Sequence, residues 1–392
     1  MSKPANVVIV GGGIIGCASA YELAKAGCAV TVIERDTVGC EASGAAAGML
    51  VPLGCPPRPG IFQELALASW RLYPETTTEL EGVTGLDVEY ITTGSLYPLF
   101  SAEEVHAAQA QCTTPLAKEL GVRVLEGHEA LELEPALSRN TRAALFAPVD
   151  HWVNNPRLTL AYAQAAHRHG ARLKLGARVT EVIVEGGRTS GVVAEGERLS
   201  ADAVLIAAGA WSGELVASLG AELPVEPARG QMLAVSNVPP LLTHCVHGSD
   251  AYVVPRPSGE LLVGATVEHV GFVRAVTPEG IGSLIRSALD LVPELADRPI
   301  TRTWSGFRPW APDSLPILGP WPGIPGLFVA TAHFRNGILL APATARLIRE
   351  LIVDGKSSLD LTPFLPDRFL QQRPEPSRAS RGRVGGRPPG QP

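Results

Sequence analysis

Residues 7–16 have the sequence Val-Val-Ile-Val-Gly-Gly-Gly-Ile-Ile-Gly, and residues 30–34 have the sequence Val-Thr-Val-Ile-Glu. The apolar run before the glycines indicates a buried strand, and the apolar spacing after them is that of a helix. The second apolar run indicates another strand, which ends on an acidic residue. This order of strand, G-x-G-x-x-G turn, helix, strand and acid predicts a dinucleotide-binding unit.

Each glycine of the motif has a physical role in such a unit. Gly11 permits the tight turn, Gly13 lets the main chain approach a pyrophosphate, and Gly16 lets the helix pack closely on the strand. The helix N-terminus offers free amides to the phosphate charge, and Glu34 can accept the ribose hydroxyls. The motif by itself leaves NAD, NADP and FAD open, and a glycine-rich turn in an ordinary α/β protein is the alternative.

Composition limits the classes of function. A chain of 392 residues suits about two domains, and its formal net charge of −6 gives the main body no electrostatic reason to bind nucleic acid. The six cysteines lack C-x-x-C spacing, which favours reduced thiols over a disulfide framework. Without a basic leader or a long apolar span, we expect a cytoplasmic protein with no stable membrane insertion. We also expect a homo-oligomer.

Two stretches after Glu34 have distinctive compositions. Residues 42–50 are mostly small, and small side chains suit a main chain that lies against a flat cofactor ring. A helix that starts with Ser43 as its N-cap is the alternative. Residues 55–60 are rich in proline and glycine and predict a loop, which is either a cover over a site or a plain linker.

The apolar pattern of the opening returns later in the chain. Residues 203–209 form an apolar run that ends in Ala-Ala-Gly, which predicts a buried parallel strand of the same doubly wound sheet. Between these two parts of the chain, short strand patterns at residues 88–99 indicate entry into a second, strand-rich domain, and strand patterns dominate again from residue 224 to 320. The chain is therefore expected to leave the nucleotide-binding domain and come back. Residues 371–392 are rich in Arg, Pro and Gly and predict a disordered basic tail.

Several sequence blocks in order carry a resemblance to a known family. They are residues 11–34, 45–50, 252–256, 306–309, 316–319 and 333–342. With them the chain resembles the D-amino-acid oxidase superfamily of FAD-dependent amine oxidoreductases, and within it the glycine oxidase family of the bacterial thiamine pathway. The block His-Phe-Arg-Asn-Gly-Ile-Leu-Leu-Ala-Pro at residues 333–342 is the most specific, and the resemblance extends over about residues 5–368.

The resemblance implies a fold and a cofactor. The expected fold is an α/β, Rossmann-like FAD-binding domain made of residues 1–87, 150–222 and 321–370, interleaved with an α+β substrate-binding domain made of residues 88–149 and 223–320 on a mostly antiparallel sheet. The expected FAD is non-covalent, because residues 306–310 lack the cysteine that attaches flavin in some relatives. The implied FAD contacts are Gly11, Gly13, Ile14, Ile15, Gly16, Glu34, Arg35, Ala42, Ser43, Ala47, Gly48, Met49, Val179, His333, Phe334, Arg335, Asn336, Gly337, Ile338 and Leu339.

The resemblance also implies a substrate site at Tyr252, Arg308 and Arg335. A guanidinium binds a carboxylate bidentately and stays charged at any working pH, and a tyrosine hydroxyl adds a neutral donor. An exposed salt bridge is the alternative for Arg308. No catalytic acid or base is expected, since hydride transfer depends mainly on orientation. We interpret His333 as a buried, hydrogen-bonded histidine near the flavin.

The implied reaction is the oxidation of glycine, sarcosine or small D-amino acids to an imine, which water converts to a 2-oxo acid while O2 reoxidises the flavin to give H2O2. The alternative is an FAD dehydrogenase for a D-amino acid or a proline-like amine that passes electrons to a quinone. An NAD(P) dehydrogenase rests on the generic motif alone. A binding module would use the basic tail for RNA, or His244, Cys245 and His247 for a metal, although these three lack a companion cluster.

Overall fold

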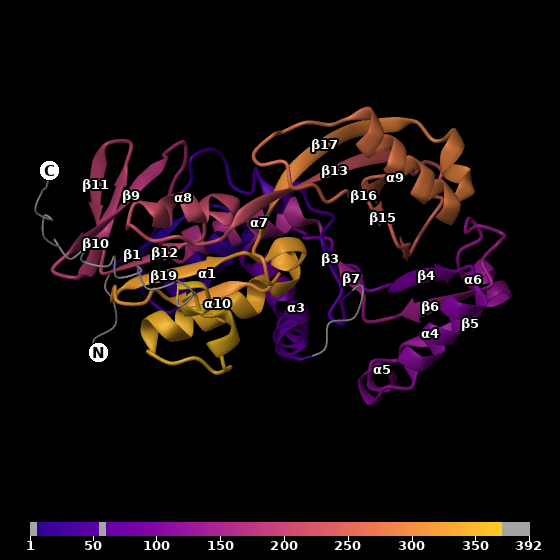
Figure 1. Cartoon of the computed structure of the whole chain (residues 1–392), viewed down its shortest axis with the longest axis horizontal. Coiled ribbons are helices and arrows are strands. Elements are labelled where there is room, and N and C mark those ends of the chain that lie inside the picture. The colour runs from indigo at the N-terminus through magenta and orange to yellow at the C-terminus, as the bar shows by residue number, and fades with distance from the viewer. Residues whose placement is uncertain (1–5, 55–59, 371–392) are drawn as a thin grey trace, which may run out of the picture.

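The computed structural model describes residues 6–54 and 60–370. The predicted tail at 371–392 and all but the last residue of the predicted loop at 55–60 lie outside the described residues. The described part is elongated, with one half around strands β1, β12 and β19 and the other around strands β4 and β6 (Figure 1). Two long strands, β13 and β17, run between the halves (Figure 1).

The first half is built on a six-stranded sheet with the order β18-β19-β12-β1-β2-β8. Its strands are β1 (Asn6–Val10), β2 (Ala29–Ile33), β8 (Arg172–Lys174), β12 (Ala203–Ile206), β18 (Ile317–Pro320) and β19 (Leu327–Thr331). All neighbours are parallel except β18 and β19. The parallel strand predicted within residues 203–209 is confirmed as β12, and it pairs directly with β1.

Alternate side chains of β1 build two different cores. Val7 and Ile9 face a layer of helices, whereas Val8 and Val10 face a small antiparallel sheet. The helices are α1 (Ile14–Lys25), α3 (Ile61–Thr84), α7 (Asn155–Arg168) and α10 (Gly337–Val353). The small sheet is β9 (Val179–Glu185), β10 (Arg188–Ala194) and β11 (Glu197–Ser200), followed by the 3-10 turn η1 (Gly209–Trp211) and helix α8 (Ser212–Ala217). Apolar side chains on both faces are what a buried parallel strand requires.

The second half is built on an eight-stranded sheet with the order β17-β13-β16-β15-β14-β4-β6-β5. Its strands are β4 (Ser95–Leu99), β5 (Arg123–Glu126), β6 (Ala143–Ala147), β13 (Glu226–Ser236), β14 (Cys245–His247), β15 (Tyr252–Arg256), β16 (Glu260–Gly264) and β17 (Ile300–Trp310). Only the pair β14 and β4 is parallel among the described pairs of this sheet. The predicted fold class, with a mostly antiparallel second sheet, is confirmed.

Helices and short elements complete this half. They are α4 (Ala102–Cys112), α5 (Pro115–Glu119), α6 (Gly127–Leu133), α9 (Pro278–Leu291) and the 3-10 turn η2 (Pro293–Asp297). Helix α2 (Ala42–Ala45) and the two-stranded sheet of β3 (Met49–Leu50) and β7 (His151–Trp152) lie between the halves, and the 3-10 turns η3 (Phe334–Asn336) and η4 (Thr362–Phe364) and helix α11 (Asp367–Leu370) follow late in the chain.

The chain passes more than once between the two sheets. Strand β18 pairs with β19 in the six-stranded sheet, whereas the sequence predicts residues 317–320 as part of the substrate-binding segment. Because Ile317 pairs with Thr331, the chain returns to the six-stranded sheet at residue 317. None of the helices in residues 6–54 and 60–370 has both the length and the apolar composition that a membrane span requires.

Candidate active site

A cavity of about 450 Å³ lies where the two sheets meet. It extends from the glycine turn before α1 to the region of Arg308 on β17. Seventeen of the twenty predicted FAD contacts line it, namely Gly11, Gly13, Ile14, Ile15, Glu34, Arg35, Ala42, Ser43, Ala47, Gly48, Met49, Val179, His333, Phe334, Arg335, Gly337 and Ile338. Gly16, Asn336 and Leu339 do not line it. Segments far apart in the sequence therefore build one cavity.

The glycine turn is shaped by close backbone contacts. Gly11 has φ +113°, and a Cβ there would lie 2.5 Å from the carbonyl oxygen of Ala207 at the end of β12. A Cβ on Gly16 would lie 1.9 Å from the carbonyl oxygen of Gly11. Gly16 therefore acts in helix packing, which is the role that the motif assigns to it, and it stays behind the cavity wall.

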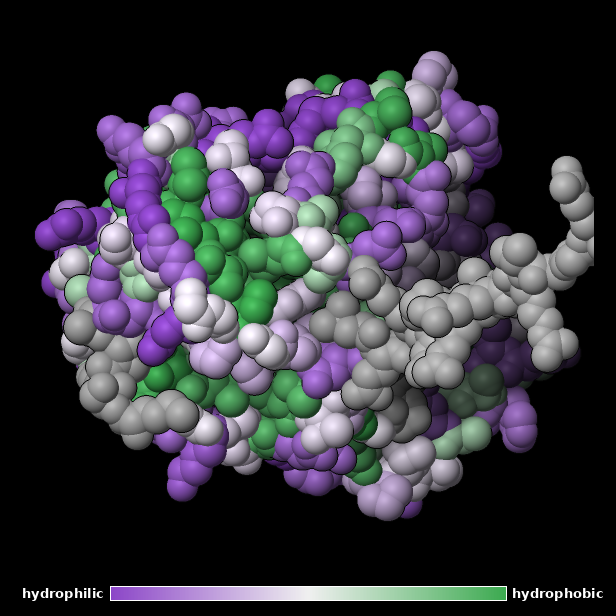
Figure 2. Space-filling model, turned by 60° about the vertical axis from the view of Figure 1, so that its left-hand side comes forward, coloured by the Kyte–Doolittle hydropathy of each residue, from purple (hydrophilic) through white to green (hydrophobic). Residues whose placement is uncertain are grey.

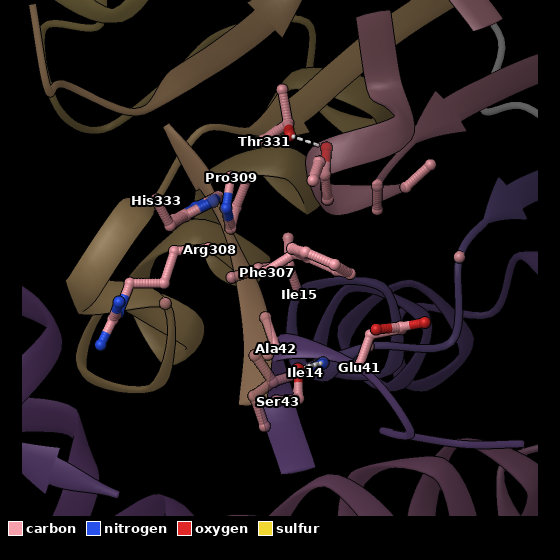
Figure 3. A pocket seen from close by; sticks show the side chains of 18 of the residues that line it. Ile14, Ile15, Glu41, Ala42, Ser43, Phe307, Arg308, Pro309, Thr331 and His333 are labelled. Atoms are coloured by element: carbon pink, nitrogen blue, oxygen red, sulfur yellow. Dashed lines mark hydrogen bonds between the residues drawn. The ribbon is translucent and has the colours of Figure 1, made fainter. Parts of the chain in front are cut away.

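The N-terminus of α1 is held by a residue from the small-residue segment. The N–H of Ile14 donates a 2.9 Å hydrogen bond to Oγ of Ser43. Ser43 therefore lies inside α2 and caps α1, whereas the N-cap of α2 is Glu41. Figure 3 shows Ser43 beside Ile14 and Ala42 at the edge of the cavity. The expectation of small residues against a cofactor agrees with this position, and the alternative of Ser43 as an ordinary N-cap is wrong.

A buried arginine supports the next part of the cavity wall. Arg256 donates to the carbonyl oxygens of Val153 and Ala47, both at 2.6 Å, and to Oδ1 of Asn155 at 3.0 Å. Burial lowers the pKa of Arg256 to about 10, so the side chain remains charged at neutral pH. Gly48 has φ +72°, and a Cβ there would lie 2.1 Å from the Val153 oxygen. Arg256 therefore fixes the turn that carries Ala47 and Gly48.

Glu41 and Trp211, which the sequence did not single out, line the cavity beside the predicted contact Arg35. The guanidinium of Arg35 lies 3.7 Å from the ring centroid of Trp211, and Arg35 forms a 2.9 Å ion pair with Glu41. Trp211 stacks on Phe272 with centroids 4.8 Å apart. Trp211 lies in the 3-10 turn η1 soon after the returning strand β12, so its position just after Ala-Ala-Gly was the available signal. Phe272 had no comparable signal, because it comes from a segment distant in sequence.

Tyr252, Arg308 and Arg335 all line the cavity, and each of the three interacts electrostatically with the other two. Nη1 of Arg308 donates a 2.9 Å hydrogen bond to the Thr266 carbonyl, and its guanidinium also interacts with the Tyr252 hydroxyl. Figure 3 shows Arg308 leaving β17 on the side opposite to Phe307. Hence the arginine is not part of an exposed salt bridge, and the alternative for Arg308 is wrong.

The electrostatics of this end favour an anion. Burial lowers the pKa of Arg308, the nearby Tyr252 opposes this shift, and the like charge of Arg335 adds to it. Burial raises the pKa of Tyr252, against the effect of Arg308 and Arg335, so the hydroxyl stays protonated. Two cations and a neutral hydroxyl donor are complementary to a carboxylate.

The segment around His333 closes the cavity from the C-terminal side. Ala332 and Phe334, on either side of it, have φ of +56° and +49°. A positive φ strains the backbone of a non-glycine residue, and such strain concentrates at functional sites. Nε2 of His333 lies 3.1 Å from Oγ1 of Thr344, and burial lowers the pKa of His333 to about 3. His333 is thus a neutral, hydrogen-bonded histidine. Leu339 is part of the apolar core beneath α10.

The three candidate metal ligands do not form a metal site. Nδ1 of His244 lies 2.7 Å from Oε1 of Glu134, while the ring of His247 stacks on Tyr97 at 4.6 Å. Within the parts of the chain that the structure describes, no group of three or more His, Cys, Asp or Glu side chains is arranged to hold a metal ion.

The lining fits an extended dinucleotide such as FAD. At one end the glycine turn is free of side chains, and Glu34 lies beside it. In the middle, a Cβ on Gly306 would lie 2.5 Å from Cβ of Ala45, so the main chain of β17 passes close to the small-residue segment. Trp211 and Phe307 add apolar surface, which is typical of cofactor sites.

Comparisons with known proteins agree with this site. A family model described as FAD dependent oxidoreductase (DAO) matches residues 6–351. A glycine oxidase from Pseudomonas aeruginosa is 40% identical over 370 residues, which cover 92% of this chain and 98% of that protein. The crystal structure of glycine oxidase from Geobacillus kaustophilus has a TM-score of 0.87 and 36% identity, over 93% of this chain and 98% of that one.

A bifunctional ThiO/ThiG protein from Nostoc sp. is 40% identical over 371 residues. This alignment covers 94% of the chain and 55% of the relative, so the chain spans about half the length of that bifunctional protein.

Proposed function

The chain belongs to the DAO family of FAD-dependent oxidoreductases, and we propose that it oxidises glycine and other small primary or secondary amines, including sarcosine and small D-amino acids. FAD is its cofactor. The observation that carries the proposal is the carboxylate-complementary group of Tyr252, Arg308 and Arg335 at one end of the cofactor cavity. Its similarity to glycine oxidases supports the choice of substrate.

In the proposed reaction, Arg308 and Tyr252 hold the substrate carboxylate and thereby fix the direction of the Cα–H bond. When bound, FAD supplies the oxidising power and takes up the hydride equivalent. The chain contributes orientation and the exclusion of water, and His333 takes no proton because it stays neutral and bonded to Thr344. Water hydrolyses the imine to a 2-oxo acid and ammonia, or methylamine when the substrate is sarcosine, and O2 accepts two electrons and two protons to give H2O2.

The same proposal includes the context of the enzyme. Among the described residues, we assign residues 6–54, 60–87, 150–222 and 317–370 to the FAD-binding domain and residues 88–149 and 223–316 to the substrate-binding domain. A cytoplasmic homo-oligomer that serves thiamine thiazole biosynthesis is part of this proposal. Figure 2 shows hydrophobic side chains gathered on one face of the molecule, and exposed apolar surface favours contact with another subunit.

To test the proposal, the purified holoenzyme is mixed anaerobically with glycine, sarcosine, D-alanine or D-proline in separate experiments. The absorbance of the oxidised flavin is recorded over time. We expect glycine to bleach the flavin, and an aerobic assay to yield one H2O2 per substrate oxidised. If none of the four amines bleaches the flavin, the proposed function is wrong. Bleaching with electron transfer to a dye, but without H2O2, would identify the quinone-linked dehydrogenase instead.

A further inference from the structure

The guanidinium of Arg308 lies directly against a glycine of the neighbouring strand. In the register of β13 and β17, Gly230 pairs with Gly306, two positions from the pair of Ala228 with Arg308. A Cβ on Gly230 would lie 2.3 Å from Nη1 and 2.6 Å from Cζ of Arg308. The guanidinium therefore occupies the space that any side chain at position 230 would fill.

The backbone conformation does not explain the glycine. Gly230 lies within β13 and is absent from the described glycines with positive φ. An alanine could take up this extended conformation without strain. Moreover, the atoms that its Cβ would meet belong to the far end of a flexible side chain. The glycine at 230 therefore makes room for the guanidinium of Arg308, and the backbone of the strand does not need it.

A partly buried polar network fixes the other side of the same guanidinium. The Thr266 carbonyl accepts from Arg308, and Oγ1 of Thr266 accepts a 2.9 Å hydrogen bond from the Gln231 N–H. The Thr266 hydroxyl in turn donates to Oε1 of Glu268 at 2.5 Å, and Nε2 of Gln231 donates to the same oxygen at 2.8 Å. Glu268 also forms an ion pair with the buried Arg229. The carbonyl that orients Arg308 is therefore itself held in place.

The hydroxyl of Tyr252 likewise lies directly against a glycine, Gly264. Tyr252 pairs with Gly264 across β15 and β16, and Gly264 pairs with Met232 on β13. A Cβ on Gly264 would lie 2.7 Å from the Tyr252 hydroxyl and 2.9 Å from Cε of Met232. The adjacent strands β13 and β16 thus each carry a glycine where a side chain would collide with Arg308 or Tyr252, the two proposed substrate ligands.

We propose that Gly230 is a specificity-determining residue that acts through Arg308: it lets the guanidinium lie flat on β13, between the Thr266 carbonyl and the Tyr252 hydroxyl, in the position that binds a substrate carboxylate. The inference rests on the proposed function. A side chain at 230 displaces the guanidinium and selectively weakens binding of ligands that carry a carboxylate.

The test compares Gly230→Ala, Arg308→Ala and the double variant as holoenzymes. Glycolate, a carboxylate without an amine, is titrated by its effect on the flavin spectrum, so binding is measured without turnover. We expect Gly230→Ala to raise the glycolate Kd and the glycine KM roughly tenfold or more, with kcat and FAD content unchanged. In the Arg308→Ala background, the same substitution is expected to have no further effect, because nothing remains to be displaced.

Gly82→Ala is the control, because Gly82 is an exposed glycine of α3 and a Cβ there would meet nothing within 4 Å. The proposal is overturned if Gly230→Ala binds glycolate like the wild type, if its effect is the same with and without Arg308, or if the wild-type holoenzyme does not bind glycolate. A wild type that binds glycolate but does not oxidise glycine contradicts the proposed function alone.

Thr266→Val provides a second variant should Gly230→Ala give no folded holoenzyme. It leaves β13 intact and removes the hydroxyl that ties Thr266 to Gln231 and Glu268. We expect a rise of a few-fold in the glycolate Kd without loss of FAD. An unchanged Kd in this variant overturns the proposal.

Discussion

The N–H of Gly12 donates a 2.6 Å hydrogen bond to Oε2 of Glu34, which joins the glycine turn to the end of β2. The other carboxylate oxygen of Glu34 accepts a 3.0 Å bond from the N–H of Asp36. Both oxygens therefore have fixed partners in the protein. Since the carboxylate is held in place before a ribose arrives, cofactor binding does not have to order it.

Glu34→Gln is expected to weaken FAD binding about tenfold or more. The amide group of glutamine cannot accept from both main-chain donors, so one of them loses its partner and the side chain no longer has a fixed orientation. The effect is measured as FAD dissociation after dilution, which the recovery of flavin fluorescence reports. Glu132→Gln, at an exposed position of α6, should leave dissociation unchanged. Equal FAD affinity of wild type and Glu34→Gln would contradict the role of Glu34.

Arg308→Ala should weaken substrate binding far more than it changes FAD content. Removing one member of a buried charge pair costs roughly 2–5 kcal/mol, which predicts a large rise in the glycine KM. Arg308→Lys should recover only part of the affinity, because an ammonium group cannot form the bidentate contact. Arg302→Ala, on the same strand but in an exposed ion pair with Glu260, is the matched control. A parallel loss of FAD would show that Arg308 is structural.

Arg256→Met should lower both the thermal stability and the retention of FAD. The methionine leaves the Val153 and Ala47 carbonyls and the Asn155 side chain without their buried donor, at about 1–3 kcal/mol for each unsatisfied group. Melting temperature and the ratio of flavin to protein absorbance measure the two effects. Unchanged FAD retention in a folded variant would show that the turn at Ala47 does not depend on Arg256.

The buried carboxyl group of Asp150 should make the stability of the protein depend on pH. Burial raises the pKa of Asp150 from 3.8 to about 7, although Tyr97 and Ser95 donate hydrogen bonds to it. At pH values between 3.8 and about 7, Asp150 holds a proton in the folded state that it has lost in the unfolded state. The free energy of unfolding therefore falls as the pH rises through this range. The loss amounts to at most about 4 kcal/mol.

Asp150→Asn should remove this slope and keep the acceptor for the Tyr97 hydroxyl, which lies 2.6 Å from Oδ2. The variant should therefore gain stability relative to the wild type as pH is raised from 4 to about 7. Urea denaturation at several pH values checks this, with Asp290→Asn at an exposed position as the control. Parallel pH profiles of wild type and Asp150→Asn would contradict the prediction.

Most of the cofactor site could be predicted from the sequence because its residues lie in short contiguous motifs. The turn at Gly11, the acid at Glu34 and the block at residues 333–342 each occur in a recognisable local pattern. Glu41 and Met232, which line the cavity, and Phe272, which stacks on the lining residue Trp211, could not be predicted in this way. Glu41 contacts Arg35 and Arg274 through side chains alone, and Phe272 meets Trp211 only because a segment of the second half crosses to the first.

The sequence by itself determined the nucleotide-binding unit, which follows from local periodicity and from the glycines that a tight turn needs. The expectation that Tyr252, Arg308 and Arg335 meet the substrate came from the resemblance to a known family. Only the tertiary structure decided how Arg308 is held, because Gly230, Thr266 and Tyr252 reach it from three different parts of the chain. A glycine in a strand carries no local signal for this role, since what it accommodates is the side chain of a neighbouring strand.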